Sequence, residues 1–219
     1  MPGMTSPQLT IDVWADVLCP WCYIGEHRLS TAVAQSPYAD RIEVKMHTWQ
    51  LDPNVPTQVT WIPEYRVKKF GVTPDQARAM EKDVAGQAAA DGLSYVLDRP
   101  VRNTLDMLRL VHLGNEHGVG ARYMAAMQAE LFGGNPDAFG HDTLVRLGGK
   151  LGVPAAEIRD VLATDRYRDA VQADHAAAVA LGARGVPFTV LGDRFALPGA
   201  AGLRQYTDAV ARAWKQING

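Results

Sequence analysis

The tetrapeptide Cys-Pro-Trp-Cys at positions 19–22 contains both cysteines of this 219-residue chain. Residues 9–17, directly before it, begin with alternating apolar and polar side chains, which predicts a β-strand. The residues after it repeat apolar side chains at helical spacing, which predicts a helix that begins at Cys19 or Pro20 and ends near Pro37. The chain must therefore adopt a fold in which a strand runs directly into a helix that opens with a Cys-x-x-Cys pair.

The rest of the chain divides into a helical middle and a β-rich end. A second strand is predicted over residues 42–49, which completes a strand-helix-strand unit. From residue 61 to about residue 181 the apolar period is helical, and one of the predicted helices opens with a capping box at Thr73. Strand patterns return at residues 186–191 and 194–197, joined by the hairpin dipeptide Gly-Asp, and a last amphipathic helix follows.

This order of elements predicts an α/β protein with a thioredoxin-like fold and a large all-helical insertion. The first part of the thioredoxin-like domain is expected over residues 9–59 as a βαβ unit. The helical insertion is expected over residues 60–182, where Asn103 is interpreted as the cap of a helix. The second part of the thioredoxin-like domain, a ββα unit, is expected over residues 183–219.

The position of the cysteines favours redox chemistry. A thiol at a helix N-terminus faces unpaired backbone N–H groups, which can lower a cysteine pKa from about 8.5 to roughly 3.5–7.5. We therefore expect Cys19 to be the exposed, attacking thiol, and Cys22, one turn later and facing the core, to resolve a mixed disulfide. Pro20 and Trp21, which separate them, are expected to tune the balance between dithiol and disulfide and to contact the substrate.

A zinc site is the alternative interpretation of a Cys-x-x-Cys pair. A structural zinc site needs two further nitrogen or sulfur ligands, and the chain has no third cysteine. His112 and His117 come closest to a ligand pair, but their spacing does not place them on one helix face. We expect no metal.

Several polar residues near the cysteines have two interpretations each. Asp16 could relay a proton for the resolving cysteine or cap the helix, and Asp12 is a second candidate for the relay. His27 is interpreted as a solvated surface residue. His47 and Trp49, which end the second strand, are expected to have a core or rim role rather than a catalytic one.

The dipeptide Val186-Pro187 opens the third predicted strand. A proline at this point is tolerated because no ladder donor is needed, so a plain loop-to-strand junction is one interpretation. In a thioredoxin-like fold the matching position is a cis-proline that faces the cysteines. We predict a cis bond, contact between the proline ring and Cys19, and pairing of the Val186 backbone with a substrate.

The charge of the chain argues against two classes of partner. The formal net charge is -2 and no run of Lys or Arg reaches five residues, so neither nucleic acid nor a membrane is expected as a partner.

The first ten residues lack the basic and apolar regions of a secretion signal, which predicts a cytoplasmic protein. Two cysteines in a reducing compartment are poor material for a structural disulfide, so they are expected to react.

The chain resembles the DsbA family, and within it the FrnE-like branch of cytoplasmic oxidoreductases. The motifs that carry the resemblance are Asp-Val-Leu-Cys-Pro-Trp-Cys-Tyr-Ile-Gly at 16–25, Arg-Asn-Thr at 102–104, Leu-Gly-Ala-Arg-Gly-Val-Pro-Phe at 181–188, and Ala-Trp at 213–214. The segment 195–202 departs from the family, whose members more often have a Gly-Ala-Gln-Pro run. The role of that loop therefore stays open.

The resemblance implies a thiol–disulfide oxidoreductase. Cys19 would be the attacking cysteine, Cys22 the resolving one and Pro187 the cis-proline, and protein thiols or small thiols would be the partners. The resemblance implies no bound cofactor and leaves open whether glutathione is a co-substrate. The direction of electron flow, the physiological substrate and the oligomeric state, monomer or homodimer, stay open.

Two other functions compete with this interpretation. Kappa-class glutathione transferases and 2-hydroxychromene-2-carboxylate isomerases share the fold and the insertion but do not need a resolving thiol. A chaperone or binding module would use the helical block with inert thiols. Four methionines in that block are expected either to form an adaptable binding surface over the active site or to fill the core: Met80, Met107, Met124 and Met127.

Overall fold

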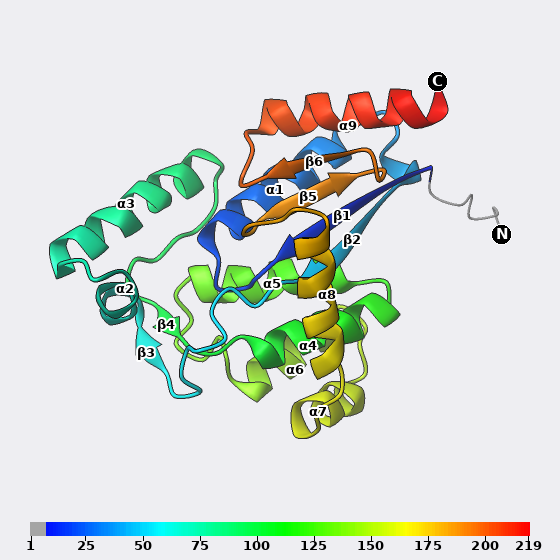
Figure 1. The fold of residues 1–219 in the computed structure, drawn as a ribbon. Coiled ribbons are helices and arrows are strands. Elements are labelled where there is room, and N and C mark those ends of the chain that lie inside the picture. The colour runs from blue at the N-terminus through cyan, green and yellow to red at the C-terminus, as the bar shows by residue number, and fades with distance from the viewer. Residues whose placement is uncertain (1–7) are drawn as a thin grey trace.

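The computed structural model describes residues 8–219, and a four-stranded sheet lies at its centre (Figure 1). The strand order is β2-β1-β5-β6, in which β1 pairs in parallel with β2 and antiparallel with β5, and β5 pairs antiparallel with β6. The strands are β1 (Leu9–Ala15), β2 (Ile42–Thr48), β5 (Phe188–Leu191) and β6 (Phe195–Pro198). Together with the helices around it, this sheet confirms the α/β, thioredoxin-like prediction.

Alternation along β1 divides the sheet into two apolar faces. Leu9, Ile11 and Val13 point into the main core, whereas Trp14 joins a second apolar cluster on the opposite face. Helices α1 (Pro20–Ala34) and α9 (Leu203–Asn218) pack against each other, and α9 also contacts β1 and β5. Helix α8 (Arg168–Ala180) contributes Ala178 to the second cluster, beside Phe188. The sheet is thus covered by helices on both faces.

The segment between β2 and β5 forms the insertion. Its helices are α2 (Ile62–Phe70), α3 (Pro74–Ala90), α4 (Leu105–Glu116), α5 (Gly120–Phe132), α6 (His141–Lys150), α7 (Ala155–Ala163) and α8; a 3₁₀ turn, η1 (Ala39–Arg41), precedes β2. The predicted capping box of α3 is present, since the Thr73 hydroxyl accepts from the Gln76 N–H at 3.2 Å and the Gln76 side chain accepts from the Thr73 N–H at 2.9 Å. None of the helices in residues 8–219 combines the length and the apolar character that crossing a lipid bilayer demands.

The insertion is not all-helical, which corrects the prediction. Strand β3 (Thr60–Trp61) pairs antiparallel with β4 (Pro100–Val101). Strands of two residues are too short to produce a period-2 pattern, so the sequence carried no signal for them. They bring the start of α2 next to the segment that leads into α4.

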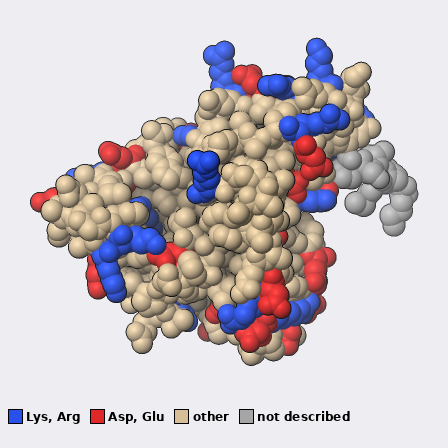
Figure 2. Space-filling view, viewed as in Figure 1, with Lys and Arg blue, Asp and Glu red and all other residues tan. Residues whose placement is uncertain are grey.

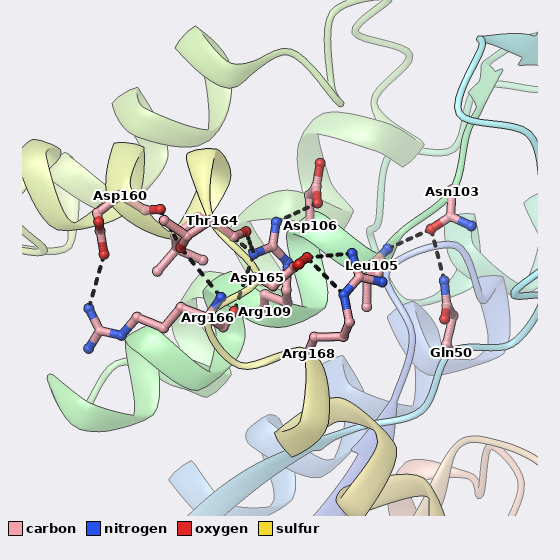
Figure 3. A network of polar contacts seen from close by, with 11 residues as sticks. Gln50, Asn103, Leu105, Asp106, Arg109, Asp160, Thr164, Asp165, Arg166 and Arg168 are labelled. Carbon is pink, nitrogen blue, oxygen red and sulfur yellow. Dashed lines mark hydrogen bonds and ion pairs between the residues drawn. The ribbon is translucent and has the colours of Figure 1, made fainter.

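Asn103 accepts a hydrogen bond from the first N–H of α4, although the cap position predicted for it belongs to Thr104. Its Oδ1 accepts hydrogen bonds from the Leu105 N–H at 3.0 Å and from the Gln50 side-chain amide at 2.8 Å (Figure 3). The helix itself starts one residue later than expected, with Thr104 in the N-cap position. Asn103 therefore also joins α4 to the loop that follows β2.

Arg109 of α4 fixes α7 in the same region. Its guanidinium is buried, donates to the backbone oxygens of Val161 and Thr164, and pairs with Asp106 at 2.7 Å (Figure 3). A buried guanidinium of this kind requires several acceptors to offset its desolvation. Arg109 therefore holds the C-terminal end of α7 against α4.

The methionines of the helical block are core residues. Met107, Met124 and Met127 are each at most 1% exposed, and only Met80 is partly accessible. The prediction of a methionine-rich binding surface is therefore wrong, because the helical spacing of these side chains directs them between α4, α5 and the sheet rather than toward solvent.

Candidate active site

The two cysteines lie where β1 passes into α1. Cys19 occupies the N-cap position of α1 in an extended conformation, and Pro20 is the first helical residue. The backbone oxygen of Cys19 accepts from the N–H groups of Cys22 at 3.1 Å and Tyr23 at 3.2 Å, which closes the first turn. Pro20 fits here because the first helical N–H has no partner to lose. The sequence thus folds locally as predicted.

Both thiols are buried. Cys19 is 3% exposed and Cys22 is 0% exposed, and the two cysteine side chains approach to 3.3 Å. The predicted exposure of Cys19 is therefore wrong, because its Sγ lies under the carbonyl oxygen of Val186, 3.7 Å away. Burial, followed by interaction with Cys19, raises the pKa of the Cys22 thiol well above its usual value. Cys22 thus stays protonated unless a base takes its proton.

The Val186–Pro187 segment covers the cysteines from the opposite side. The peptide bond between these residues is cis, and the Pro187 carbonyl accepts from the Gly199 N–H at 2.8 Å. A Cβ atom at Gly25 of α1 would lie 3.3 Å from the Pro187 Cγ, so the ring packs closely on the helix. The Val186 carbonyl faces Cys19, whereas contact of the Pro187 ring with Cys19 stays a prediction. Strand β5 begins after this segment, at Phe188 rather than Val186.

Asp16 connects three segments around the cysteines. Its buried carboxylate accepts hydrogen bonds from the Leu18 N–H at 3.0 Å, the Leu51 N–H at 2.6 Å and the Thr104 hydroxyl at 3.1 Å. Burial raises its pKa to about 6, although these hydrogen bonds oppose the shift. Asp16 does not cap α1, because Cys19 has the N-cap position without any side-chain cap bond. It ties the loop before α1 to the loop after β2 and to α4.

Asp12, the second relay candidate, is engaged elsewhere. Its carboxylate lies 2.7 Å from Nε2 of His47, whose Nδ1 lies 3.2 Å from Asp174 of α8. Burial lowers the pKa of His47, but the hydrogen bonds to Asp12 and Asp174 outweigh it and raise the pKa to about 9. The His47 ring stacks on Trp14, with centroids 4.4 Å apart. This group anchors α8 on the sheet, so the predicted core or rim role of His47 is confirmed.

The remaining histidines do not gather at the cysteines. His112 lies 3.2 Å from the Asp174 carboxylate, whereas His117 pairs with Glu157 on the surface at 3.0 Å. His27 is exposed, as predicted. Trp49 is buried and its ring lies 4.0 Å from that of His175. His112 and His117 thus belong to two separate groups.

The sequence patterns did not single out two acidic residues, Glu26 near Cys22 and Asp174 of α8. Glu26 lies one turn after Cys22 on α1, and its Oε1 accepts from the Gln128 side-chain amide of α5 at 3.0 Å. Asp174 organises the group around His47 and also accepts from the Thr48 N–H at 2.7 Å. The available signal was a carboxylate in line with apolar residues of a predicted helix, and both acids are partly buried.

Comparisons with known proteins agree with this architecture. A sequence model of the DSBA-like thioredoxin domain matches residues 10–211. The probable DsbA oxidoreductase of Streptomyces coelicolor is 35% identical, with a TM-score of 0.87, over 95% of this chain and 91% of that chain. A comparison with curated proteins found no match.

Two more distant structures share the fold. A 2-hydroxychromene-2-carboxylate isomerase is 19% identical with a TM-score of 0.70, over 94% of this chain and 97% of that chain. The cytosolic disulfide reductase DsbM of Pseudomonas aeruginosa, solved with GSH, is 21% identical with a TM-score of 0.60, over 95% and 96% of the two chains. At these identities the likeness concerns the fold alone. The match over residues 10–211 and the 35% identity show that the chain belongs to the DSBA-like thioredoxin domain family.

Proposed function

We propose that this protein is a cytoplasmic thiol–disulfide oxidoreductase that exchanges disulfides with protein or small-thiol substrates. The observation that carries the proposal is the pair formed by Cys19 and Cys22, whose side chains approach to 3.3 Å at the N-terminus of α1. Cys19 lies at the N-cap position of α1, and Cys22 is close enough to form a disulfide with it. The Val186 carbonyl beside Cys19 supports a site for a substrate backbone.

The exchange has two steps. The Cys19 thiolate attacks one sulfur of a substrate disulfide, so that a mixed disulfide forms and the other substrate sulfur leaves as a thiolate. The Cys22 thiol then loses its proton and attacks Cys19 Sγ; the Cys19–Cys22 bond forms, the bond to the substrate breaks, and the substrate leaves reduced. The reverse sequence transfers the disulfide to a reduced substrate.

The surface near the cysteines suits an apolar or flexible partner. Trp21, between the cysteines, is 42% exposed, and Leu51, whose N–H donates to Asp16, is also exposed. Figure 2 shows that uncharged residues cover most of the middle of this face, between the α2–α3 lobe and α8. Pro20, Trp21 and the Val186 backbone are proposed as the substrate contacts. The GSH in the DsbM structure supports a test of glutathione as co-substrate of this protein. The assignment to the FrnE-like branch stays a prediction.

Glutathione-dependent reduction of insulin, a protein with accessible disulfides, tests the proposal. We expect wild-type protein to accelerate the reaction, Cys19→Ser to abolish the acceleration, and Cys22→Ser to lose turnover while an adduct accumulates on Cys19. Full turnover by Cys22→Ser would contradict the proposal and favour glutathione-dependent isomerase or transferase chemistry. No acceleration by the wild type, with partner binding unchanged when both cysteines are replaced, would favour a chaperone.

A further inference from the structure

The loop between β6 and α9 is bonded to Pro187 but has almost no side chains of its own. Its residues 199–202 are Gly-Ala-Ala-Gly, so no side chain in this loop is longer than a methyl group. The Gly199 N–H donates to the Pro187 carbonyl at 2.8 Å, and the φ of 77° at Gly199 is one that glycine adopts without strain. The position of the loop therefore depends on groups from other elements.

Arg28 of α1 is a long side chain that reaches this loop. Its Nη1 donates to the Ala201 carbonyl oxygen at 3.4 Å, and its Nε donates to the Asp91 carboxylate at 2.6 Å. The Arg28 and Asp91 side chains are 13% and 20% exposed, so water only partly reaches the pair. The donors of a guanidinium form a rigid, planar fork, so the bond to Asp91 also fixes the direction of the bond to Ala201.

Helix α3 supports Arg28 from the side of the insertion. Ile24, one turn before Arg28 on α1, packs against Val84 and Ala88 of α3. Asp91 follows at the C-terminal end of α3, which points toward the loop before α9 (Figure 1). The insertion thus supports this loop through one side chain of α1.

The same contacts continue to the reactive cysteine. Cys19 is 3% exposed, and its Sγ lies 3.7 Å from the Val186 carbonyl oxygen. The next residue, Pro187, is the one that accepts from the Gly199 N–H. A shift of the loop would therefore move the segment that covers Cys19 and that is proposed to pair with a substrate backbone.

We propose that Arg28 is a positioning residue for disulfide exchange at Cys19. By bonding Ala201 to α1, it keeps the Val186–Pro187 segment in the position in which this segment covers the thiol and aligns the substrate. The inference rests on the proposed function. It also gives the loop at 199–202 a role, as the connection between α1 and that segment.

Alkylation by iodoacetamide measures how well the segment covers Cys19. The rate is measured for Cys19 in a Cys22→Ser background and for Cys22 in a Cys19→Ser background. We expect Arg28→Gln to raise the Cys19 rate about threefold or more, because a released segment exposes its Sγ. The Cys22 rate should not change, because Cys22 is 0% exposed and lies one turn inside α1. A variant that only lost overall stability would react faster at both cysteines.

Steady-state reduction of a disulfide-bonded peptide in glutathione buffer measures alignment of the substrate. For Arg28→Gln we expect a KM about threefold or more above that of the wild type and a kcat within about twofold, because backbone pairing contributes to binding. Asp91→Asn keeps Arg28 and removes its charged support, so it should change the KM and the Cys19 rate in the same directions by smaller factors. Arg146→Gln is the matched control, because it breaks a 2.7 Å ion pair with Glu130 on the surface; it should change neither quantity.

Two results would overturn the inference. One is that Arg28→Gln and Asp91→Asn both behave like Arg146→Gln in alkylation rate and in KM. The other is an equal acceleration of alkylation at Cys19 and Cys22, which would show a role in overall stability alone. If Arg28→Gln does not fold, Asp91→Asn decides between these outcomes. Failure of the proposed function is distinguishable, because the wild type itself would then not reduce the peptide, whereas the alkylation rates do not depend on turnover.

Discussion

Asp16 shows how one buried side chain can determine the position of a reactive loop. Its two oxygens accept from two backbone N–H groups, those of Leu18 and Leu51, and from the Thr104 hydroxyl. An asparagine has only one accepting oxygen, so Asp16→Asn must leave at least one buried backbone N–H without a partner. We expect the variant to lose about 1–3 kcal/mol of unfolding free energy.

The pH dependence of this loss follows from the raised pKa of Asp16, about 6 in the folded chain. A raised carboxyl pKa adds stability that is fully present below the unfolded value, about 3.9, and that is lost as pH rises through 6. The advantage of wild type over Asp16→Asn should therefore be larger at pH 4.5 than at pH 7.5 in urea denaturation. An advantage that stays constant or grows with pH would contradict this account. The alkylation rate of Cys19 against pH in the same variant tests whether Asp16 also acts on the thiols.

Helix α1 carries the site at its N-terminus and packs against the Pro187 segment through Gly25. A Cβ atom at position 25 would lie 3.3 Å from both Pro187 Cγ and the Tyr206 hydroxyl, which is tighter than ordinary contact. Gly25→Ala should therefore displace the Pro187 segment from α1 and slow the attack of Cys19 on a disulfide substrate several-fold.

Gly86→Ala on α3 is the matched control, because a Cβ atom there meets nothing within 4 Å. Alanine in an exposed helix interior should stabilise the protein by up to about 1 kcal/mol and leave exchange unchanged. If Gly25→Ala behaves like Gly86→Ala in both stability and exchange rate, close packing of α1 on Pro187 is not required for reactivity.

Helix α8 is held on the sheet by the group of His47, Asp12 and Asp174. The pKa of His47 is raised to about 9 from its usual 6.5, so its contribution is fully present below pH 6.5 and is lost as pH rises through 9. His47→Gln should lower the unfolding free energy by about 1–3 kcal/mol at pH 6, with allowance for partial solvent screening, and by much less at pH 10. Exposed His27→Gln is the control; equal losses at both pH values would contradict the anchoring role.

Across the whole molecule, features that depend on local sequence patterns were predicted better than features that depend on contacts between distant segments. The strand-to-helix passage at the cysteines, the capping box at Thr73 and the return to strands after the insertion all depend on residues close in the sequence, and all are present. The pairing of Thr60–Trp61 with Pro100–Val101 was missed because two-residue strands have no periodicity.

The site was predicted less completely, because its surroundings come from distant segments. Cys19 was expected to be exposed, but a carbonyl 167 residues away covers it. The partner of Glu26 lies 102 residues away on α5, and Asp174 meets His47 across 127 residues. Such contacts depend on how the insertion packs against the sheet, which no local pattern encodes.

The redox equilibrium of Cys19 and Cys22 tests the central claim most directly. Protein is equilibrated in glutathione buffers of stepped potential, quenched with acid, alkylated and analysed by mass spectrometry with peptide mapping. We expect one two-electron transition that joins Cys19 to Cys22, with a midpoint between about -270 and -120 mV. In Cys22→Ser we expect a single glutathione on Cys19. Two free thiols across the whole series, or a stable glutathione adduct on Cys19 of the wild type, would contradict a redox-active pair.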